Sequence, residues 1–137
     1  MTIMTRIKSP EFIRMPAIVI GEDDLEALNR LADQARGHLV AAAQQLLTEL
    51  MRARIVAQNK LPAKTVRMGS IVTFTIDDGP ARTAELVWPD RADIAADRIS
   101  ILTPVGAALI GVSVGQTIDW RSPDDRRRSL TVTAVTA

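Results

Sequence analysis

The fold of this chain is decided by the stretch Thr103-Pro104-Val105-Gly106-Ala107-Ala108-Leu109-Ile110-Gly111, which runs on into Val112-Ser113-Val114-Gly115-Gln116-Thr117-Ile118-Asp119-Trp120. Proline presets φ for the first position of a helix, so Pro104 predicts where a short apolar helix begins. Gly111 suits the left-handed residue that ends such a helix, and the residues after it predict a turn and a strand. Between Thr103 and Ile118 this stretch contains no Cys, His, Lys, Arg, Glu or Asp, so it is suited to packing and poorly suited to acid–base chemistry.

The composition of the 137-residue chain limits its chemistry. Its 17 Lys and Arg against 16 Asp and Glu give a formal net charge of +1, so no overall field favours nucleic acid or an anionic membrane. The absence of cysteine excludes disulfides and thiol catalysis and favours a cytoplasmic protein. The single histidine excludes a multi-histidine metal site, and no cofactor is expected. No run reaches the roughly 18 apolar residues of a membrane span, so no membrane association is expected.

Residues 1–21 are predicted to be a leader. Met1 to Arg14 show no periodicity and Met15-Pro16 resembles a second start, so this part is expected to be disordered or derived in part from a cloning vector. Ala17 to Ile20 suggest a short extended segment. The acidic cluster Glu22-Asp23-Asp24 then suits the positive end of a helix and needs no metal ion to explain it.

Residues 22–58 are predicted to form an antiparallel helical hairpin, a short coiled coil. Apolar residues alternate at spacings of three and four on both sides of a glycine, as coiled-coil seams do. They are Leu25, Leu28, Ala32 and Ala35 before it and Leu39, Ala43, Leu46, Leu50, Ala53 and Ala57 after it. A second arm from Leu39 to Ala57 would be roughly 28 Å long. The predicted tip is Arg36, Gly37 and His38.

Residues 59–64 are predicted to be a linker, because Pro62 stops a helix. Residues 65–137 are predicted to form an antiparallel sheet with one short helix. Strands are expected at 71–76, 82–88, 98–102, 118–121 and 130–135, the first two joined by a turn at 77–80. Trp88 and Trp120 are expected to pack in the core or at the sheet edge. Arg126, Arg127 and Arg128 are expected in an exposed, charged turn. The predicted fold class is α+β.

Several stretches resemble the Gre-type transcript-cleavage factors. The resemblance rests on residues 66–74, on Ile99-Ser100-Ile101, on residues 103–111 and on Val114-Gly115, and it covers about the second half of the chain. The motif Thr-Pro-Val-Gly-Ala-Ala-Leu and the short hairpin look closest to the Rnk-type regulators of nucleoside diphosphate kinase. The resemblance implies an FKBP-like sheet domain that docks on bacterial RNA polymerase at the rim of its secondary channel, with the hairpin directed towards that channel.

The resemblance also separates two functions. In the cleavage factors, acidic residues at the hairpin tip help to hold a catalytic metal in the polymerase, because Mg²⁺ prefers oxygen ligands. Here the nearest acid, Asp33, has no acidic partner across the turn. The chain is therefore predicted to be a non-enzymatic polymerase-binding regulator that does not stimulate cleavage and can compete with factors that do. Its expected docking residues are Ser100, Thr103, Pro104, Val105 and Gly106.

Three alternatives remain open from the sequence. The first is an active transcript-cleavage or elongation factor. The second is a peptidyl-prolyl isomerase of FKBP-like fold, although the only aromatic residues for a proline pocket are Phe12, Phe74, Trp88 and Trp120. The third is direct nucleic-acid binding, which has the least support because stacking aromatic residues and a net basic surface are missing, and no direct sequence-specific nucleic-acid partner is expected.

Overall fold

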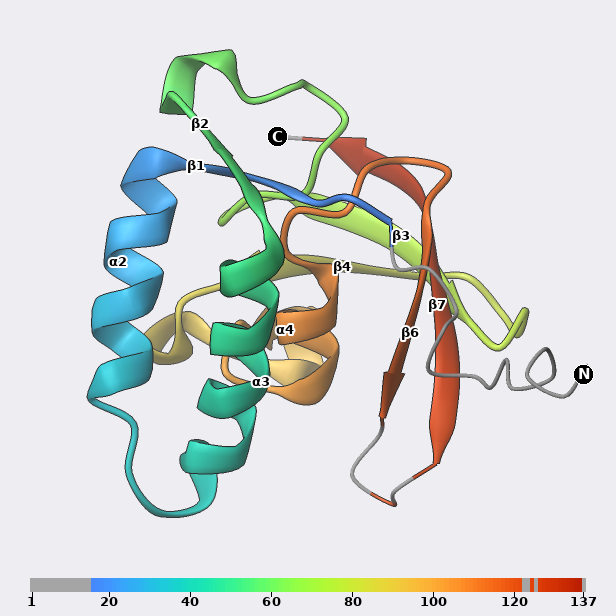
Figure 1. Ribbon diagram of the computed structural model, residues 1–137. Coiled ribbons are helices and arrows are strands. Elements are labelled where there is room, and N and C mark those ends of the chain that lie inside the picture. The colour runs from blue at the N-terminus through green and yellow to red at the C-terminus, as the bar shows by residue number, and fades with distance from the viewer. Residues whose placement is uncertain (1–15, 122–123, 125, 137) are drawn as a thin grey trace, which may run out of the picture.

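A helical hairpin lies beside a twisted sheet in the computed structural model, which describes residues 16–121, 124 and 126–136 (Figure 1). The hairpin consists of α2 (Glu22–Asp33) and α3 (Val40–Arg52), and the short helix α4 (Pro104–Leu109) lies between α3 and the sheet. The remaining elements are the strands β1 (Val19–Gly21), β2 (Arg54–Val56), β3 (Ile71–Ile76), β4 (Arg82–Val87), β5 (Arg98–Ser100), β6 (Thr117–Arg121) and β7 (Arg127–Thr136), and the 3₁₀ turns η2 (Gly37–Leu39), η3 (Gln58–Lys60), η4 (Pro89–Arg91) and η5 (Ile94–Ala96). The predicted α+β class is confirmed.

The larger sheet has the strand order β5-β4-β3-β7-β6, so the predicted five strands are present. β3 pairs antiparallel with β4 and β7, and β7 pairs antiparallel with β6. The prediction of a fully antiparallel sheet is wrong at one edge, because β4 and β5 are parallel. Residues 88–97, which include η4 and η5, form a crossover connection, so that β5 runs in the same direction as β4 when it pairs with it.

Two predicted boundaries in the amino-terminal part are wrong. The leader is predicted to reach residue 21, but Val19–Gly21 form β1, which pairs in parallel with β2; the extended segment predicted at Ala17 to Ile20 is confirmed as a strand at Val19 and Ile20. The second helix was expected to reach Ala57, but it ends at Arg52, and Ala53 takes up an extended backbone with φ −76° and ψ 148°. The β-branched residues of β2 favour a strand here, and their pairing with β1 overrides the helical spacing of the alanines. The predicted disorder or vector origin of residues 1–15 lies outside the described residues.

One hydrophobic core joins the hairpin to the sheet. Leu28 and Leu46 come from the two arms of the hairpin, and both are fully buried. The same core contains Ile18, Ile20, Val72, Phe74, Leu86, Ile101, Leu109, Ile118 and Leu130. The partly buried tryptophans pack against it, Trp88 after β4 and Trp120 on the edge strand β6, as predicted. The segments predicted as a hairpin and a sheet domain therefore share one continuous hydrophobic core.

A side chain from η3 holds the base of the hairpin. Gly21 precedes α2 and offers no side-chain cap. The Oε1 atom of Gln58 instead accepts hydrogen bonds from the backbone N–H groups of Asp23 (3.0 Å) and Asp24 (3.2 Å). These donors have no partner within the helix, so Gln58 takes the place of the missing cap.

The turn between β3 and β4 is fixed by a carboxylate. Asp77 and Asp78 have φ of 52° and 59°, and the Gly79 N–H donates to the Ile76 carbonyl at 2.9 Å, so Ile76 to Gly79 form a β-turn of mirror-image type. The Asp77 carboxylate accepts hydrogen bonds from the Ser129 N–H (2.8 Å) and from Nη1 of Arg128 (2.9 Å). Arg126 is exposed and precedes β7, as predicted, whereas Arg127 and Arg128 are the first residues of β7 and form ion pairs, so they do not belong to the turn.

We expect Asp77 to titrate below its ordinary pKa of 3.8, because the Ser129 N–H and then the Arg128 guanidinium stabilise its charged form. A carboxyl whose pKa is lowered by folding stabilises the protein above its unfolded-state pKa, and this contribution is lost as the pH falls through the folded-state pKa. Carbon-detected NMR of the side chain measures the midpoint. Arg128→Gln should raise it, whereas Arg82→Gln should leave it unchanged. An Asp77 midpoint at or above 3.8 would contradict the assignment.

Candidate functional site

The loop that enters α4 is closed by its own hydroxyl groups. Thr103 is the N-cap, and its Oγ1 atom accepts a hydrogen bond from the Gly106 N–H (3.0 Å) and donates one to the Ser100 carbonyl (2.7 Å). The Oγ atom of Ser100 accepts a hydrogen bond from the Leu102 N–H at 3.0 Å. Both hydroxyls predicted for docking therefore have a structural role inside the loop.

Gly106 is present because the chain passes too close to it for a side chain. A Cβ atom there would lie 2.1 Å from the Ser100 carbonyl oxygen and 2.9 Å from the Cα atom of Ile101. Both contacts are with backbone, which cannot rotate away. At the other end of the motif, Gly111 has φ +78°, as predicted for the residue that ends the helix.

Both ends of the motif 103–111 are bonded to the amino-terminal part of the chain. Nε2 of Gln45 in α3 donates to the Pro104 carbonyl at 3.0 Å, and the Val19 N–H of β1 donates to the Gly111 carbonyl at 3.1 Å. The motif is thus the junction between the hairpin and the sheet. Gln45 was missed by sequence reasoning, because one polar residue beside an apolar seam carries no signal of its partner.

The predicted docking residues are only partly accessible. Gly106 is buried, whereas Ser100, Thr103, Pro104 and Val105 are half-buried. With the Ser100 and Thr103 hydroxyls and the Pro104 carbonyl already engaged, this loop can offer a partner mainly its shape and the apolar surface of Pro104 and Val105.

The hairpin tip carries two basic residue types, an arginine and a histidine. Gly37 has φ +59°, a left-handed backbone conformation that is strained for residues with a side chain. Space is not the reason for the glycine, because a Cβ atom there would meet nothing within 4 Å. Arg36 and His38 are exposed on either side of it, and Asp33 is exposed at the end of α2. Within the described ranges, no group of three or more His, Cys, Asp or Glu residues is placed to hold a metal ion.

A hollow of about 290 Å³, the tip hollow, lies between the hairpin tip and the sheet part of the chain. It is lined by Leu31, Gln34, Ala35, Arg36, Leu39, Pro89 and Leu102. Leu102 directly precedes the N-cap of α4, so the structure brings the predicted tip and the predicted docking loop to the same surface. The sequence had placed them in separate units.

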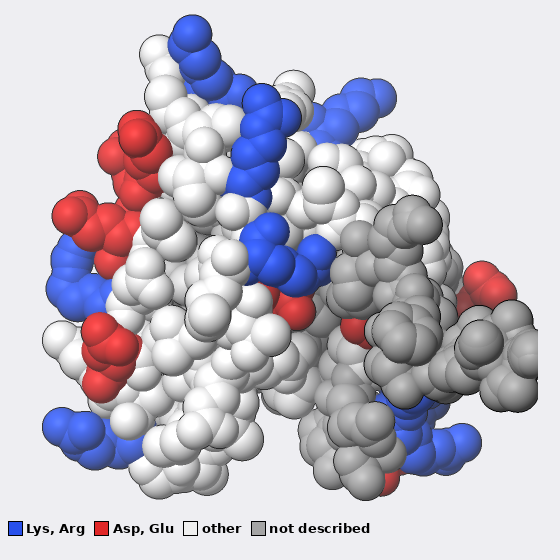
Figure 2. Space-filling view, in the orientation of Figure 1, with Lys and Arg blue, Asp and Glu red and all other residues white. Residues whose placement is uncertain are grey.

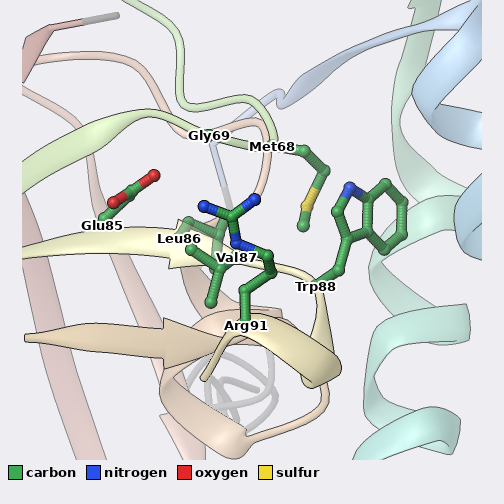
Figure 3. Close-up of a pocket in the computed structure, with 7 residues that line it drawn as sticks. All are labelled: Met68, Gly69, Glu85, Leu86, Val87, Trp88 and Arg91. Carbon is green, nitrogen blue, oxygen red and sulfur yellow. The ribbon is translucent and has the colours of Figure 1, made fainter. Parts of the chain in front are cut away.

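A second hollow of about 180 Å³, the Trp88 hollow, lies on the other side of η4 (Figure 3). It is lined by Met68, Gly69, Glu85, Leu86, Val87, Trp88 and Arg91. Figure 3 shows Arg91 reaching across it from η4, with Met68 and Trp88 on one side and Glu85 on the other. Sequence reasoning missed Met68 and Arg91, because only the fold brings their segments together.

Charge is distributed unevenly over the face that carries the hairpin (Figure 2). Acidic side chains gather along the side of α2, whose first turn contains Glu22, Asp23 and Asp24. Lysine and arginine side chains cross the region of β2 and the segment after it, while the surface over α3 is mostly uncharged. The hairpin thus presents an acidic flank, and its tip carries Arg36 and His38.

Comparisons with known proteins agree with this architecture. Residues 61–137 match the family described as transcription elongation factor, GreA/GreB, C-term, and residues 16–56 match the Rnk N-terminus family. The regulator of nucleoside diphosphate kinase from Escherichia coli K12 is 35% identical over 109 residues, which are 79% of this chain and 80% of that protein. Transcription elongation factor GreA from Thermodesulfovibrio yellowstonii is 32% identical over 81% of this chain and 76% of that protein.

A solved structure shows the same fold. The prokaryotic transcription elongation factor GreA/GreB from Nitrosomonas europaea superimposes with a TM-score of 0.69 at 32% identity, covering 89% of this chain and 99% of that one. In the part of the chain that the structure describes, no helix has the length and apolar character needed to cross a membrane. The chain belongs to the GreA/GreB family and joins its carboxy-terminal part to the amino-terminal part typical of Rnk regulators.

Proposed function

We propose that this chain is a cytoplasmic transcription regulator that binds bacterial RNA polymerase at the rim of the secondary channel and does not stimulate transcript cleavage. Family membership supports the elongation-factor-like role, because matched relatives have the names transcription elongation factor GreA and regulator of nucleoside diphosphate kinase. By occupying the channel entrance, it would compete with cleavage factors.

The chemistry of the hairpin tip supports the proposal that the chain does not stimulate transcript cleavage. A hard metal ion needs carboxylate oxygens, and the tip offers Arg36 and His38 instead. Asp33 is the nearest acid, and it stands alone at the end of α2. The arms of 12 and 13 residues are each only about 18 to 20 Å long, shorter than the sequence predicted. A short, cationic tip suits a blocker of the channel entrance.

The docking surface that we propose consists of Ser100, Thr103, Pro104, Val105 and Gly106. In this set, Gly106 gives the loop its shape, and Pro104 and Val105 form its accessible apolar part. The finer fold assignments, an FKBP-like sheet domain and a coiled-coil hairpin, belong to the same proposal. The buried seam residues Leu28, Ala32, Ala43, Leu46 and Leu50 support the second of them.

Peptidyl-prolyl isomerase activity has less support. Phe74 is buried in the core; Trp88 follows β4, Trp120 lies on β6, and both pack against that core. Of these three side chains, only Trp88 lines the Trp88 hollow, so this hollow does not gather them into a proline pocket, and Phe12 lies outside the described residues. Strong catalysis of proline isomerisation in a short peptide would favour the enzyme over the regulator.

The proposal predicts binding without cleavage. We expect the purified chain to bind core RNA polymerase, to displace a labelled GreA, and to leave the RNA of a stalled elongation complex at full length. GreA alone is the positive control, because it should shorten the RNA in the same preparation. Failure to bind core polymerase would reject the proposed function. Shortened RNA with this chain alone would instead identify it as an active cleavage factor.

A further inference from the structure

We propose that the Trp88 hollow is a socket for one acidic side chain of RNA polymerase, held by Arg91. The inference rests on the proposed function and adds a specific contact to it. The hollow lies outside the residues predicted for docking, and only the folded chain reveals it.

Arg91 is available for such a contact. It is exposed, and its guanidinium makes no hydrogen bond or ion pair with any residue that the structure describes. Its backbone is fixed, because the Arg91 N–H donates to the Trp88 carbonyl at 2.9 Å in η4. The side chain extends into the hollow rather than away from it (Figure 3). A guanidinium that extends into the hollow, with no partner there among the described residues, can form charge-assisted hydrogen bonds with an incoming carboxylate.

The walls of the hollow suit the stem of an acidic side chain. Trp88, Met68 and Val87 provide apolar surface, and the Trp88 and Met68 side chains lie together on one side (Figure 3). Contact with these walls removes water from the guanidinium and from its partner, which strengthens their attraction. A glutamate or aspartate combines the required methylene stem with one carboxylate.

Charge and size argue against other ligands. Glu85 lies on the far side of the hollow and is already paired with Arg98 at 3.7 Å. A phosphate of RNA carries one negative charge, as a carboxylate does, but an RNA chain would bring several such charges past Glu85, whereas a protein side chain brings only one. The volume of about 180 Å³ is below the roughly 300 Å³ at which small-molecule and cofactor sites begin, so a side chain of a partner fits better.

The hollow is continuous with the proposed docking loop. Val87 pairs with Ser100 in the sheet, and the Ile101 N–H donates to the Val87 carbonyl at 2.9 Å. η4 lies between the two hollows, with Pro89 in the tip hollow and Arg91 in the Trp88 hollow. A single polymerase surface that contacts Pro104 and Val105 can therefore place an acidic side chain against Arg91.

The test compares the affinity of core RNA polymerase for the full chain and for three variants at low and moderate salt. We expect Arg91→Gln to weaken binding about tenfold, Arg91→Lys to weaken it less, and the loss to shrink as salt rises. Arg82→Gln is the matched control, because it removes the same charge from another exposed arginine. Arg82 lies at the end of β4 that is farther from Trp88. This variant should bind within about twofold of the unaltered chain.

The outcomes separate the two proposals. If the unaltered chain binds and Arg91→Gln behaves like Arg82→Gln, the socket is wrong and the proposed function stands. If the unaltered chain does not bind, both are wrong. If Arg91→Gln weakens binding to a single-stranded RNA oligonucleotide but leaves binding to polymerase intact, the hollow takes phosphate, and the socket is again wrong.

Discussion

Gly106→Ala is expected to lower the free energy of unfolding by about 3 kcal/mol or more, the upper end of the cost of overpacking a core. The added methyl group would lie 2.1 Å from the Ser100 carbonyl oxygen, and it could fit only if the loop and α4 moved apart. That movement would break the cap, in which Thr103 accepts the Gly106 N–H at 3.0 Å. Chemical denaturation followed by circular dichroism measures the loss.

Gly115→Ala is the matched control. Gly115 has φ +91°, and nothing lies within 4 Å of a Cβ atom there. Its replacement should therefore cost only the strain of a left-handed alanine, about 1 to 2 kcal/mol. Equal losses for the two variants would mean that the close approach at Gly106 does not hold the loop in place.

The result at Gly106 bears on function as well. The same loop carries Pro104 and Val105, the accessible part of the proposed docking surface, and it places Leu102 in the tip hollow. A change that moves α4 from the loop would disturb both. A loss of polymerase binding in Gly106→Ala would thus report a displaced surface, which is why the Arg91 variants are the sharper test of contact.

Local chemistry explains what could be predicted from the sequence. Pro104 and Gly111 carry their conformational preferences with them, so the limits of α4 were found without knowledge of any neighbour. The strand Ile71–Ile76 was found for the same reason, because its residues are β-branched or aromatic throughout. The hairpin seam was also found, since its spacing is a property of each helix alone.

What the sequence could not provide depends on contacts between distant segments. Arg54 to Val56 fit a helical pattern and form a strand only because β1 lies beside them. The parallel pairing of β4 with β5 depends on how η4 and η5 turn the chain. The same holds at the site, because Met68 and Arg91 come from separate segments and meet only in the folded Trp88 hollow.

Leu46→Ala is expected to destabilise the whole chain by about 3 kcal/mol, as truncation of a fully buried leucine usually does. Leu46 belongs to the hairpin, but the core that it enters also contains Leu109 of α4 and Leu130 of β7. We therefore expect the loss to appear in the sheet part of the chain too. Met51→Ala is the control on the same helix, because Met51 is 86% exposed, and it should change stability by less than about 0.5 kcal/mol.

Two probes decide whether the hairpin and the sheet unfold together. Circular dichroism follows the helices, most of which lie in the hairpin, whereas tryptophan fluorescence follows the sheet part, since Trp88 and Trp120 both lie there. In Leu46→Ala, both curves should move to lower denaturant by the same amount, because Gln45 and Val19 bond the hairpin part to the two ends of the α4 motif. A shift in circular dichroism alone would instead show an independent hairpin. In that case the motif 103–111 would connect two units that unfold independently, and its contacts would not couple the hairpin to the sheet.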